Sequence, residues 1–335
     1  MLFSTTQHAA ASDACTTGAI HTEATVSVSN GNQYRTETAF HTRNNAMINF
    51  IDDETSMISV EGPLAWSRDQ DGDHIADEFM RSFALGHQFH AFILHFGKIA
   101  TEITATPDIA FQGNSHSGFI GKLPFGGKVS LVGDNWEEPQ GYIFKFPNTP
   151  AIEVMFFDWR KMENRDLPFH IRIDDQSDVY DYKYSKVEIT ERTPLWFMNE
   201  VAAPDIDAVQ IYRLHRKLLA AHCMGDADLM ASLTAPETLV ASRGDLFHSS
   251  DQETRSRFNS VFNRVVYSHY TDLAEPEIEV SSGGDIGWAG VNVRAEGAEV
   301  KSGEPFSDQW AWVMLTRKID GVWYNAGNAS NSKDE

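Results

Sequence analysis

The sequence predicts an α+β protein of two domains, and three observations support this prediction. As far as Thr193, short segments alternate between apolar and polar residues, which is typical of antiparallel strands. From Asp205 onwards apolar residues recur at helical spacing, and strand patterns return only near the C-terminal end. The length of 335 residues also fits two domains, since a domain holds roughly 100 to 200 residues.

The domain boundaries follow from these changes of pattern. Residues 1–17 are rich in Ser, Thr and Ala, and we expect them to form a flexible arm. Pro194 and Pro204 bracket the change of period between the domains. We therefore predict a β-rich domain over residues 18–200 and a second domain over residues 201–335.

Seven segments of the first domain are predicted to be strands of one antiparallel sheet. They are residues 22–29, 47–51, 56–60, 141–146, 151–157, 169–173 and 180–189. Between residues 77 and 98, large apolar residues recur near helical spacing, which predicts one or two helices with an aromatic face. These residues are Phe79, Phe83, Phe89, Phe92, Ile93 and Phe96. We expect the helices to cover the sheet.

The second domain is predicted to begin with helices and to end with a sheet. A helix starts near Asp205 and stops at Gly225, and a short second helix follows over residues 226–233. Ser249-Ser-Asp-Gln-Glu253 is typical of the capped start of a third helix. Four strands then fit residues 277–282, 286–295, 308–318 and 322–329.

Charge and composition exclude several classes of protein. The chain has 48 acidic and 27 basic residues, a formal charge of -21, so it would repel nucleic acid and anionic lipid. No segment reaches the roughly 18 apolar residues of a membrane span. The two cysteines, Cys15 and Cys223, lie far apart and are predicted to be free thiols. We expect a cytoplasmic protein, or a periplasmic one if a leader was removed.

Two motifs of the second domain resemble those of the nuclear transport factor 2-like superfamily, especially its SnoaL-like (polyketide-cyclase-like) members. They are Gly284-Asp-Ile-Gly-Trp288, which enters a long strand, and Lys318-Ile-Asp-Gly-Val-Trp323, which joins the last two strands. The resemblance implies a cone-shaped α+β barrel of cystatin-like type, with a curved sheet wrapped round helices. The superfamily includes dehydratases, isomerases, epoxide hydrolases, lyases and binding domains, so fold alone does not define function.

The first domain is similar to the lipoprotein-sorting-protein family in four segments. These are residues 142–146, 157–160, 167–170 and 178–184. The resemblance implies an antiparallel half-barrel closed by helices over an apolar cavity. The chain departs from that family because it lacks a clear leading helix and a lipid-attachment sequence.

The candidate catalytic residues lie in the second domain. The resemblance implies that enzymes of this kind place Tyr, His, Asp or Arg side chains in the cone to move a proton. We expect His269 to be the general base, with Tyr212 and Tyr267 as donors or acids, because Tyr267 and His269 share one face of an extended segment. His215 lies three residues after Tyr212 on the first helix, and Tyr212 with Asp272 is the next pair to consider.

Six further residues are candidates for binding substrate, because alternate residues of a curved sheet face the same side. They are Arg243, Tyr270, Trp288, Asn292, Trp310 and Asn328. Arg243 is expected to neutralise an anionic group of the substrate. A rival interpretation is that the aromatic residues among them serve packing alone.

His87, His90 and His95 form the one grouping that suggests a metal. Their spacing could bring two or three imidazoles towards one side of a helix. No nearby acidic residue completes a ligand set, so hydrogen-bonded histidines are the alternative. We expect no metal and no other cofactor.

The sequence therefore predicts binding of a small, largely apolar organic molecule, with aromatic compounds included in that class. The expected reaction is metal-independent acid–base chemistry of lyase, dehydratase or isomerase type in the C-terminal cone. The alternative is a non-catalytic carrier of lipophilic ligands. A buried ionisable group inside the cone would favour catalysis, and a wholly apolar cone would favour carriage. A third alternative is that the C-terminal sheet is chiefly a homo-oligomer interface.

Overall fold

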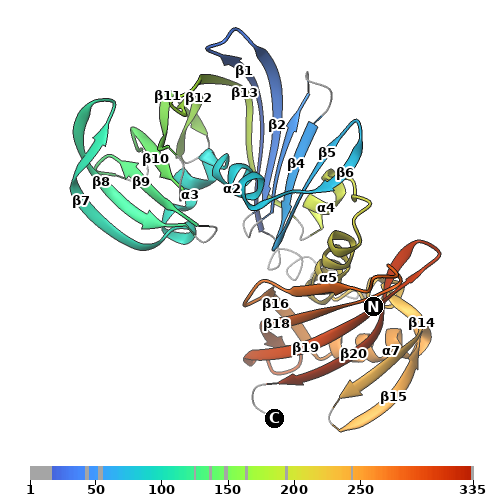
Figure 1. Cartoon of the computed structure of the whole chain (residues 1–335). Helices are drawn as coiled ribbons and strands as arrows, with labels where there is room; N and C mark the ends of the chain where they lie inside the picture. The colour runs from blue at the N-terminus through green and yellow to red at the C-terminus, as the bar shows by residue number, and fades with distance from the viewer. Residues whose placement is uncertain are drawn as a thin grey trace, which may run out of the picture. The chain divides into compact units, whose positions relative to one another are not determined.

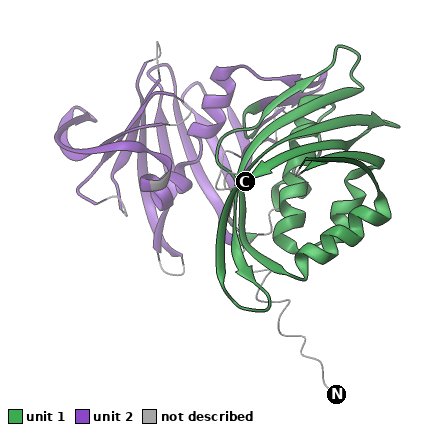
Figure 2. Cartoon of the chain, turned by 90° about the horizontal axis from the view of Figure 1, so that it is seen from below, with its two compact units in different colours: residues 1–18, 61–64, 191–335 green, residues 19–60, 65–190 purple. Residues whose placement is uncertain are grey.

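The computed structural model describes residues 17–41, 45–51, 56–123, 126–135, 138–146, 150–162, 165–192, 195–242 and 244–332. The described chain is mostly β-sheet with few helices (Figure 1). It divides into two compact units, which are coloured separately in Figure 2. Unit 2 comprises residues 19–60 and 65–190. Among the described residues, unit 1 comprises 17–18, the short segment 61–64 and everything from Glu191 onwards. The predicted arm lies outside the described residues apart from Thr17, the first residue of a strand.

The strands of the N-terminal half form one thirteen-stranded sheet, in the order β6-β5-β4-β3-β2-β1-β13-β12-β11-β10-β9-β8-β7. The strands are β1 (Thr17–Val28), β2 (Gln33–His41), β3 (Asn45–Phe50), β4 (Ser56–Glu61), β5 (Leu64–Asp69), β6 (Gly72–Ile75), β7 (Thr101–Phe111), β8 (Asn114–Lys122), β9 (Lys128–Val132), β10 (Gly141–Lys145), β11 (Ile152–Met162), β12 (Arg165–Asp174) and β13 (Val179–Arg192). Neighbours such as β1 and β2 pair antiparallel, as predicted. The sheet is open, because β6 and β7 are its edges.

Two helices pack into this sheet, α2 (Glu78–Gly86) and α3 (Phe89–Ile99). Helix α2 begins where the Asp77 carboxylate accepts a hydrogen bond from the Met80 amide at 2.9 Å. The buried face of α3 includes Phe92, whose ring lies 5.7 Å from that of Tyr142. The predicted helices are therefore confirmed, except that Phe79 is 63% exposed and does not belong to the packed aromatic face.

The described part of unit 1 contains four helices and a seven-stranded sheet in the order β15-β14-β20-β19-β18-β16, with β17 paired to β18. The helices are α4 (Trp196–Glu200), α5 (Asp207–Met224), α6 (Ala227–Ser232) and α7 (Asp251–Phe262). The strands are β14 (Thr234–Ser242), β15 (Asp245–Ser250), β16 (Val265–Asp272), β17 (Glu277–Val280), β18 (Ile286–Glu299), β19 (Pro305–Ile319) and β20 (Val322–Ser332).

Local sequence signals account for the ends of the helices in unit 1. Gly225 ends α5 in the left-handed conformation, with φ of 62°. Ser250 and Glu253 form a capping box at the start of α7. Both features agree with the predicted helix ends.

The sheet of unit 1 has two distinct faces. The face that packs against α5 is named the inner face, and its core includes Ile211 of the helix with Val291 and Met314 of the sheet. Residues opposite one another in register share a face, so Trp312 lies beside Val291 on the inner side. The other face is named the outer face, and it carries Val313. The predicted cone-shaped site would lie on the inner face, between the sheet and α5.

Cys223 is disulfide-bonded, so the prediction of two free thiols is wrong. The only other cysteine of the chain is Cys15, which lies outside the described residues. Across the ranges that the structure describes, no helix is both long enough and apolar enough to cross a membrane.

Candidate active site

Three side chains, His215, Arg216 and Asp272, form a buried charged group between α5 and the end of β16. His215 Nε2 is 2.7 Å from one carboxylate oxygen of Asp272, and Arg216 donates a hydrogen bond of 3.0 Å to the other. The His215 side chain is 0% exposed and that of Asp272 is 13% exposed. The opposing charges of Arg216 and Asp272 compensate for the loss of water.

The chemistry of this group depends on the charge of Asp272. Burial raises the pKa of Asp272, but the charges and hydrogen bonds of His215 and Arg216 outweigh burial and hold the pKa below its usual value. Asp272 is therefore an ionised acceptor at neutral pH, so His215 Nε2 donates the hydrogen bond between them. The other ring nitrogen, Nδ1, faces away from this bond. That atom is buried and has no hydrogen-bond partner among the described residues.

Helix α5 and strand β16 bring these residues together from distant parts of the sequence. His215 follows Ile211 by four residues and precedes Leu218 by three, so it lies on the apolar face of α5. Asp272 is opposite the fully buried Val293 in register and therefore points to the inner face. This geometry makes His215 a candidate general base that Asp272 orients.

Aromatic side chains continue from this group along the inner face. The ring of Trp312 lies 5.9 Å from that of His215, and Tyr270 lies 6.4 Å from Trp312. Tyr270 also stacks on His222 at 4.2 Å and meets Tyr267 edge-on at 5.1 Å. All of these rings except His215 are only half-buried, so water reaches the aromatic end of the face. This surface suits a flat apolar ligand.

The structure does not place His269 in this site. A β-bulge between Tyr267 and His269 shifts the register of β16 against β18. As a result Tyr267 and Tyr270 contact each other, whereas the His269 side chain is 57% exposed and lies 3.8 Å from Glu296. The expectation that Tyr267 and His269 share an inward face is therefore wrong. The geometry moves the candidate base from His269 to His215.

Tyr212 lies near the charged group, whereas Tyr267 lies at the aromatic end of the inner face beside Tyr270. Tyr212 is 4% exposed, and burial raises the pKa of its phenol, while the charges of Arg216 and Asp272 also act on it. Burial likewise raises the pKa of Tyr267 to about 12. Both phenols are thus protonated hydrogen-bond donors at neutral pH.

The remaining candidates divide between the two faces. Trp310 lies opposite the buried Val293, and Asn328 lies opposite Met314, so both are on the inner face. Trp288 and Asn292 lie on the outer face, because their neighbours Ala289 and Val291 point inwards. They are therefore separated by the sheet from His215, contrary to the expectation that they share one site. Arg243 lies outside the described residues.

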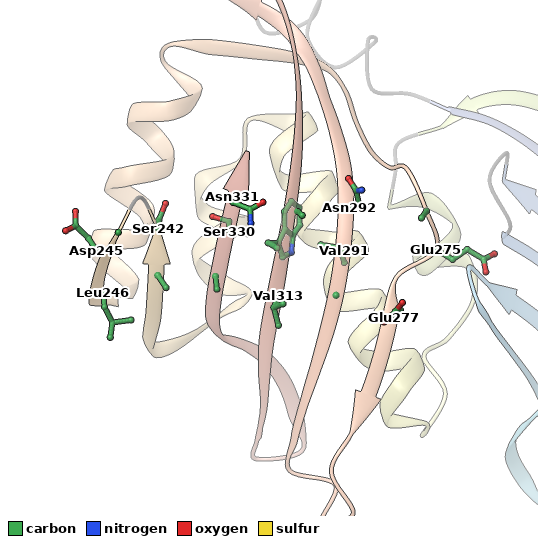
Figure 3. Close-up of a pocket in the computed structure, with 17 residues that line it drawn as sticks. Ser242, Asp245, Leu246, Glu275, Glu277, Val291, Asn292, Val313, Ser330 and Asn331 are labelled. Atoms are coloured by element: carbon green, nitrogen blue, oxygen red, sulfur yellow. The ribbon is translucent and has the colours of Figure 1, made fainter. Parts of the chain in front are cut away.

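The outer face carries a shallow groove of about 790 Å³, shown in Figure 3. Asn292, Val313 and Asn331 of its lining come from the neighbouring strands β18, β19 and β20. Its described lining also includes the carboxylates of Asp245 and Glu277. The groove lies on the opposite side of the sheet from the buried histidine.

The histidines of α3 do not form a metal centre in the structure. His87 Nδ1 is 2.8 Å from the Phe83 carbonyl oxygen, and His90 Nε2 is 2.9 Å from the Pro168 carbonyl oxygen. Burial lowers the pKa of both rings to about 4. Within the described ranges, no three His, Cys, Asp or Glu side chains are grouped as metal ligands would be.

The lowered pKa of Asp272 predicts how stability depends on pH. Since the folded pKa lies below the usual value of 3.8, ionised Asp272 stabilises the fold above that value. The contribution is lost as the pH falls through the folded pKa. We expect Asp272→Asn to destabilise the protein most above about pH 4 and progressively less below it. Urea denaturation of both proteins over this pH range measures the effect, and a constant difference would contradict it.

Sequence reasoning considered His215 but did not select it, and it missed Arg216. The available signal was the position of His215 within the apolar stripe of α5, beside Leu214 and Leu218. A histidine in such a stripe is buried when the helix packs.

No protein-family model matches the sequence, and no curated protein matches it. Parts of the chain are similar to solved structures. A ketosteroid isomerase-like protein from Erwinia carotovora atroseptica has 16% identity and a TM-score of 0.33, covering 38% of this chain and 96% of its own. A nuclear transport factor 2-like superfamily protein from Salmonella enterica serovar Typhimurium has 14% identity and a TM-score of 0.34, covering 38% and 90%.

A hexachlorocyclohexane dehydrochlorinase, LinA type 2, has 15% identity and a TM-score of 0.32, covering 37% of this chain and 83% of its own. At such identities and TM-scores, the similarity carries no information about activity.

Proposed function

We propose that unit 1 binds a small, largely apolar, preferentially aromatic molecule and catalyses acid–base chemistry on it. The proposed reaction is of lyase, dehydratase or isomerase type, with His215 as the base. The observation that carries this proposal is the buried Nδ1 atom of His215, which has no partner among the described residues while Asp272 holds the opposite nitrogen. A carboxylate that holds one nitrogen of an imidazole leaves the other nitrogen available to act as a base.

The proposed mechanism starts with proton transfer from a carbon atom of the substrate to His215 Nδ1. The electron pair of the broken C–H bond moves into the substrate, where it forms an enolate or expels a leaving group. Ionised Asp272 stabilises the imidazolium ion that results, and Arg216 keeps Asp272 in place. The imidazolium then returns the proton to a different substrate atom or to the leaving group. Neither proton transfer requires a metal.

The rival proposal is a carrier without catalysis, and it has less support. A carrier gains nothing from a buried ion pair, because taking charges out of water is costly. In unit 2, a lipophilic ligand would also have to displace Phe89, Phe92 and Phe96, which belong to the buried core cluster there. These contacts favour catalysis in unit 1 over carriage in both units.

Exchange of carbon-bound hydrogen tests the proposed function even while the substrate is unidentified. The protein is incubated in D₂O with a panel of aryl ketones and hydroxylated aromatic compounds, and NMR follows the loss of C–H signals. We expect exchange or conversion of at least one compound. Compounds that bind but are neither exchanged nor converted would support the carrier instead.

We further propose that the outer face of the unit 1 sheet pairs two copies of the chain. Val313 and Leu315 are 42% and 45% exposed there, and they lie two residues apart on the same face of β19. Val313→Glu should convert a dimer to a monomer, as measured by light scattering after size exclusion. Val300→Glu, at a 45% exposed residue in a turn after β18, is the matched control and should leave the mass unchanged. A monomeric parent protein would refute the interface.

The disulfide at Cys223 leads us to propose an oxidising compartment, such as the periplasm, instead of the cytoplasm. Protein purified without reductant should then show no reactive thiol after denaturation, and both cysteines should react after reduction. Detection of both thiols without reduction would contradict the assignment.

A further inference from the structure

Three buried oxygen atoms on the inner face of the unit 1 sheet lack a hydrogen-bond partner among the described residues. They are Thr316 Oγ1, Asn325 Oδ1 and Asn328 Oδ1. Thr316 is 1% exposed and Asn325 is 8% exposed, and the two are opposite each other where β19 pairs with β20. The register of β19 and β20 shifts between Leu315 and Thr316, so the next residue of β20 on the same face is Asn328, opposite Met314. These three residues are named the acceptor strip.

The surroundings of the acceptor strip are apolar. Met314 lies between Thr316 and Trp312 along the inner face of β19, and it is 1% exposed. Ile211 of α5 approaches the sheet at Gly287, the residue opposite Thr316. A buried oxygen without a donor destabilises a protein, and Val or Leu would fill these positions without that cost. The polar residues are therefore better explained by a ligand than by stability.

The hydrogen-bonding chemistry of the acceptor strip restricts which functional group of a ligand could bind there. The oxygens of Asn325 and Asn328 accept hydrogen bonds, so the ligand must donate, which a carbonyl or an ether cannot do. An ammonium group would donate, but the strip holds no carboxylate to balance its charge. A neutral hydroxyl group meets both conditions, and the Thr316 hydroxyl can donate to its oxygen in return.

We propose that the acceptor strip binds a hydroxyl group of the substrate, so that the substrate is a hydroxylated but otherwise apolar molecule, such as a phenol or a naphthol. This proposal rests on the proposed function and specifies its substrate class.

The separation between the acceptor strip and Trp312, the neighbour of His215, fits a molecule of this size. Strands rise about 3.3 Å per residue, so the level of Met314 and Asn328 is about 7 Å from that of Trp312. Trp312 in turn contacts the ring of His215. A hydroxyl group held at Asn328 thus places one aromatic ring beside Trp312, with its far side towards His215.

The test compares two probes, 2-naphthol and its methyl ether 2-methoxynaphthalene, which differ in the hydrogen-bond donor. Calorimetry on the full chain should show 2-naphthol binding at least about tenfold more tightly than the ether. Thr316→Val, which keeps the side-chain shape, should weaken 2-naphthol about fivefold and leave the ether unchanged. It should not lower the unfolding midpoint, because it removes an unsatisfied oxygen. Thr271→Val, on the outer face of the same sheet, is the matched control and should change neither affinity.

Equal binding of the two probes by the parent protein would overturn the hydroxyl proposal while leaving the proposed function intact. A lower unfolding midpoint for Thr316→Val would also overturn it, since the hydroxyl would then be satisfied within the protein. Binding of neither probe would overturn both the hydroxyl proposal and the aromatic site of the proposed function.

Discussion

His215→Gln is expected to lower turnover by about a hundredfold or more in the hydrogen-exchange assay. The reason is that general acid–base groups contribute roughly 10² to 10⁴ in rate, and the variant removes the lone pair at Nδ1. Glutamine has a similar volume and still offers an N–H group to Asp272, so the variant should remain folded. Turnover is measured with the compound that the parent protein exchanges fastest.

His269→Ala is the matched comparison for that experiment, because it removes a histidine of the same unit that is exposed on the outer side. We expect it to turn over substrate at the parent rate. If His269→Ala is inactive while His215→Gln is active, the assignment of the base is reversed. Circular dichroism shows whether either change in rate reflects unfolding, and Asp272→Asn provides a second variant of the same group.

Phe92→Ala is expected to have the largest effect on stability in unit 2, a loss of roughly 3 to 5 kcal/mol in the free energy of unfolding. Phe92 is 1% exposed and its ring meets those of Tyr142 and Phe144 at 5.7 and 5.2 Å. Its removal leaves a cavity that the sheet and α3 cannot close without moving. Chemical denaturation followed by circular dichroism measures the change.

The control for Phe92→Ala is Phe79→Ala on the neighbouring helix α2. Phe79 is 63% exposed, so its loss should change stability by no more than about 0.5 kcal/mol. Similar small effects for both variants would show that α3 does not pack into the sheet. That result would favour the apolar cavity that the resemblance to the lipoprotein-sorting-protein family implies for unit 2.

Local signals made most of the helices predictable, but they left α4 and several strands unpredicted. The start of α7 was predictable because Ser250 and Glu253 lie at the spacing of a capping box. Strand β7 was missed because most of its side chains are exposed on both faces, so apolar and polar residues do not alternate. Strand β14 contains Pro236, which interrupts the pattern expected of a strand.

The candidate site was only partly predictable, because its decisive contacts are not local. The segment from Tyr267 to Asp272 was expected to matter, and it does supply Asp272 and Tyr270 to the inner face. The bulge that turns His269 outwards depends on pairing with β18, which residue alternation does not reveal. The bond between His215 and Asp272 joins residues 57 positions apart, and no spacing rule links them.

The central claim is that His215 offers a free lone pair on Nδ1 while Asp272 holds the proton on Nε2. Long-range ¹H–¹⁵N NMR of the imidazole rings at neutral pH tests this claim most directly. We predict the pattern of a neutral ring protonated on Nε2, and loss of that pattern in Asp272→Asn. A His215 ring that carries a proton on Nδ1 at neutral pH would contradict the proposed base and the mechanism built on it.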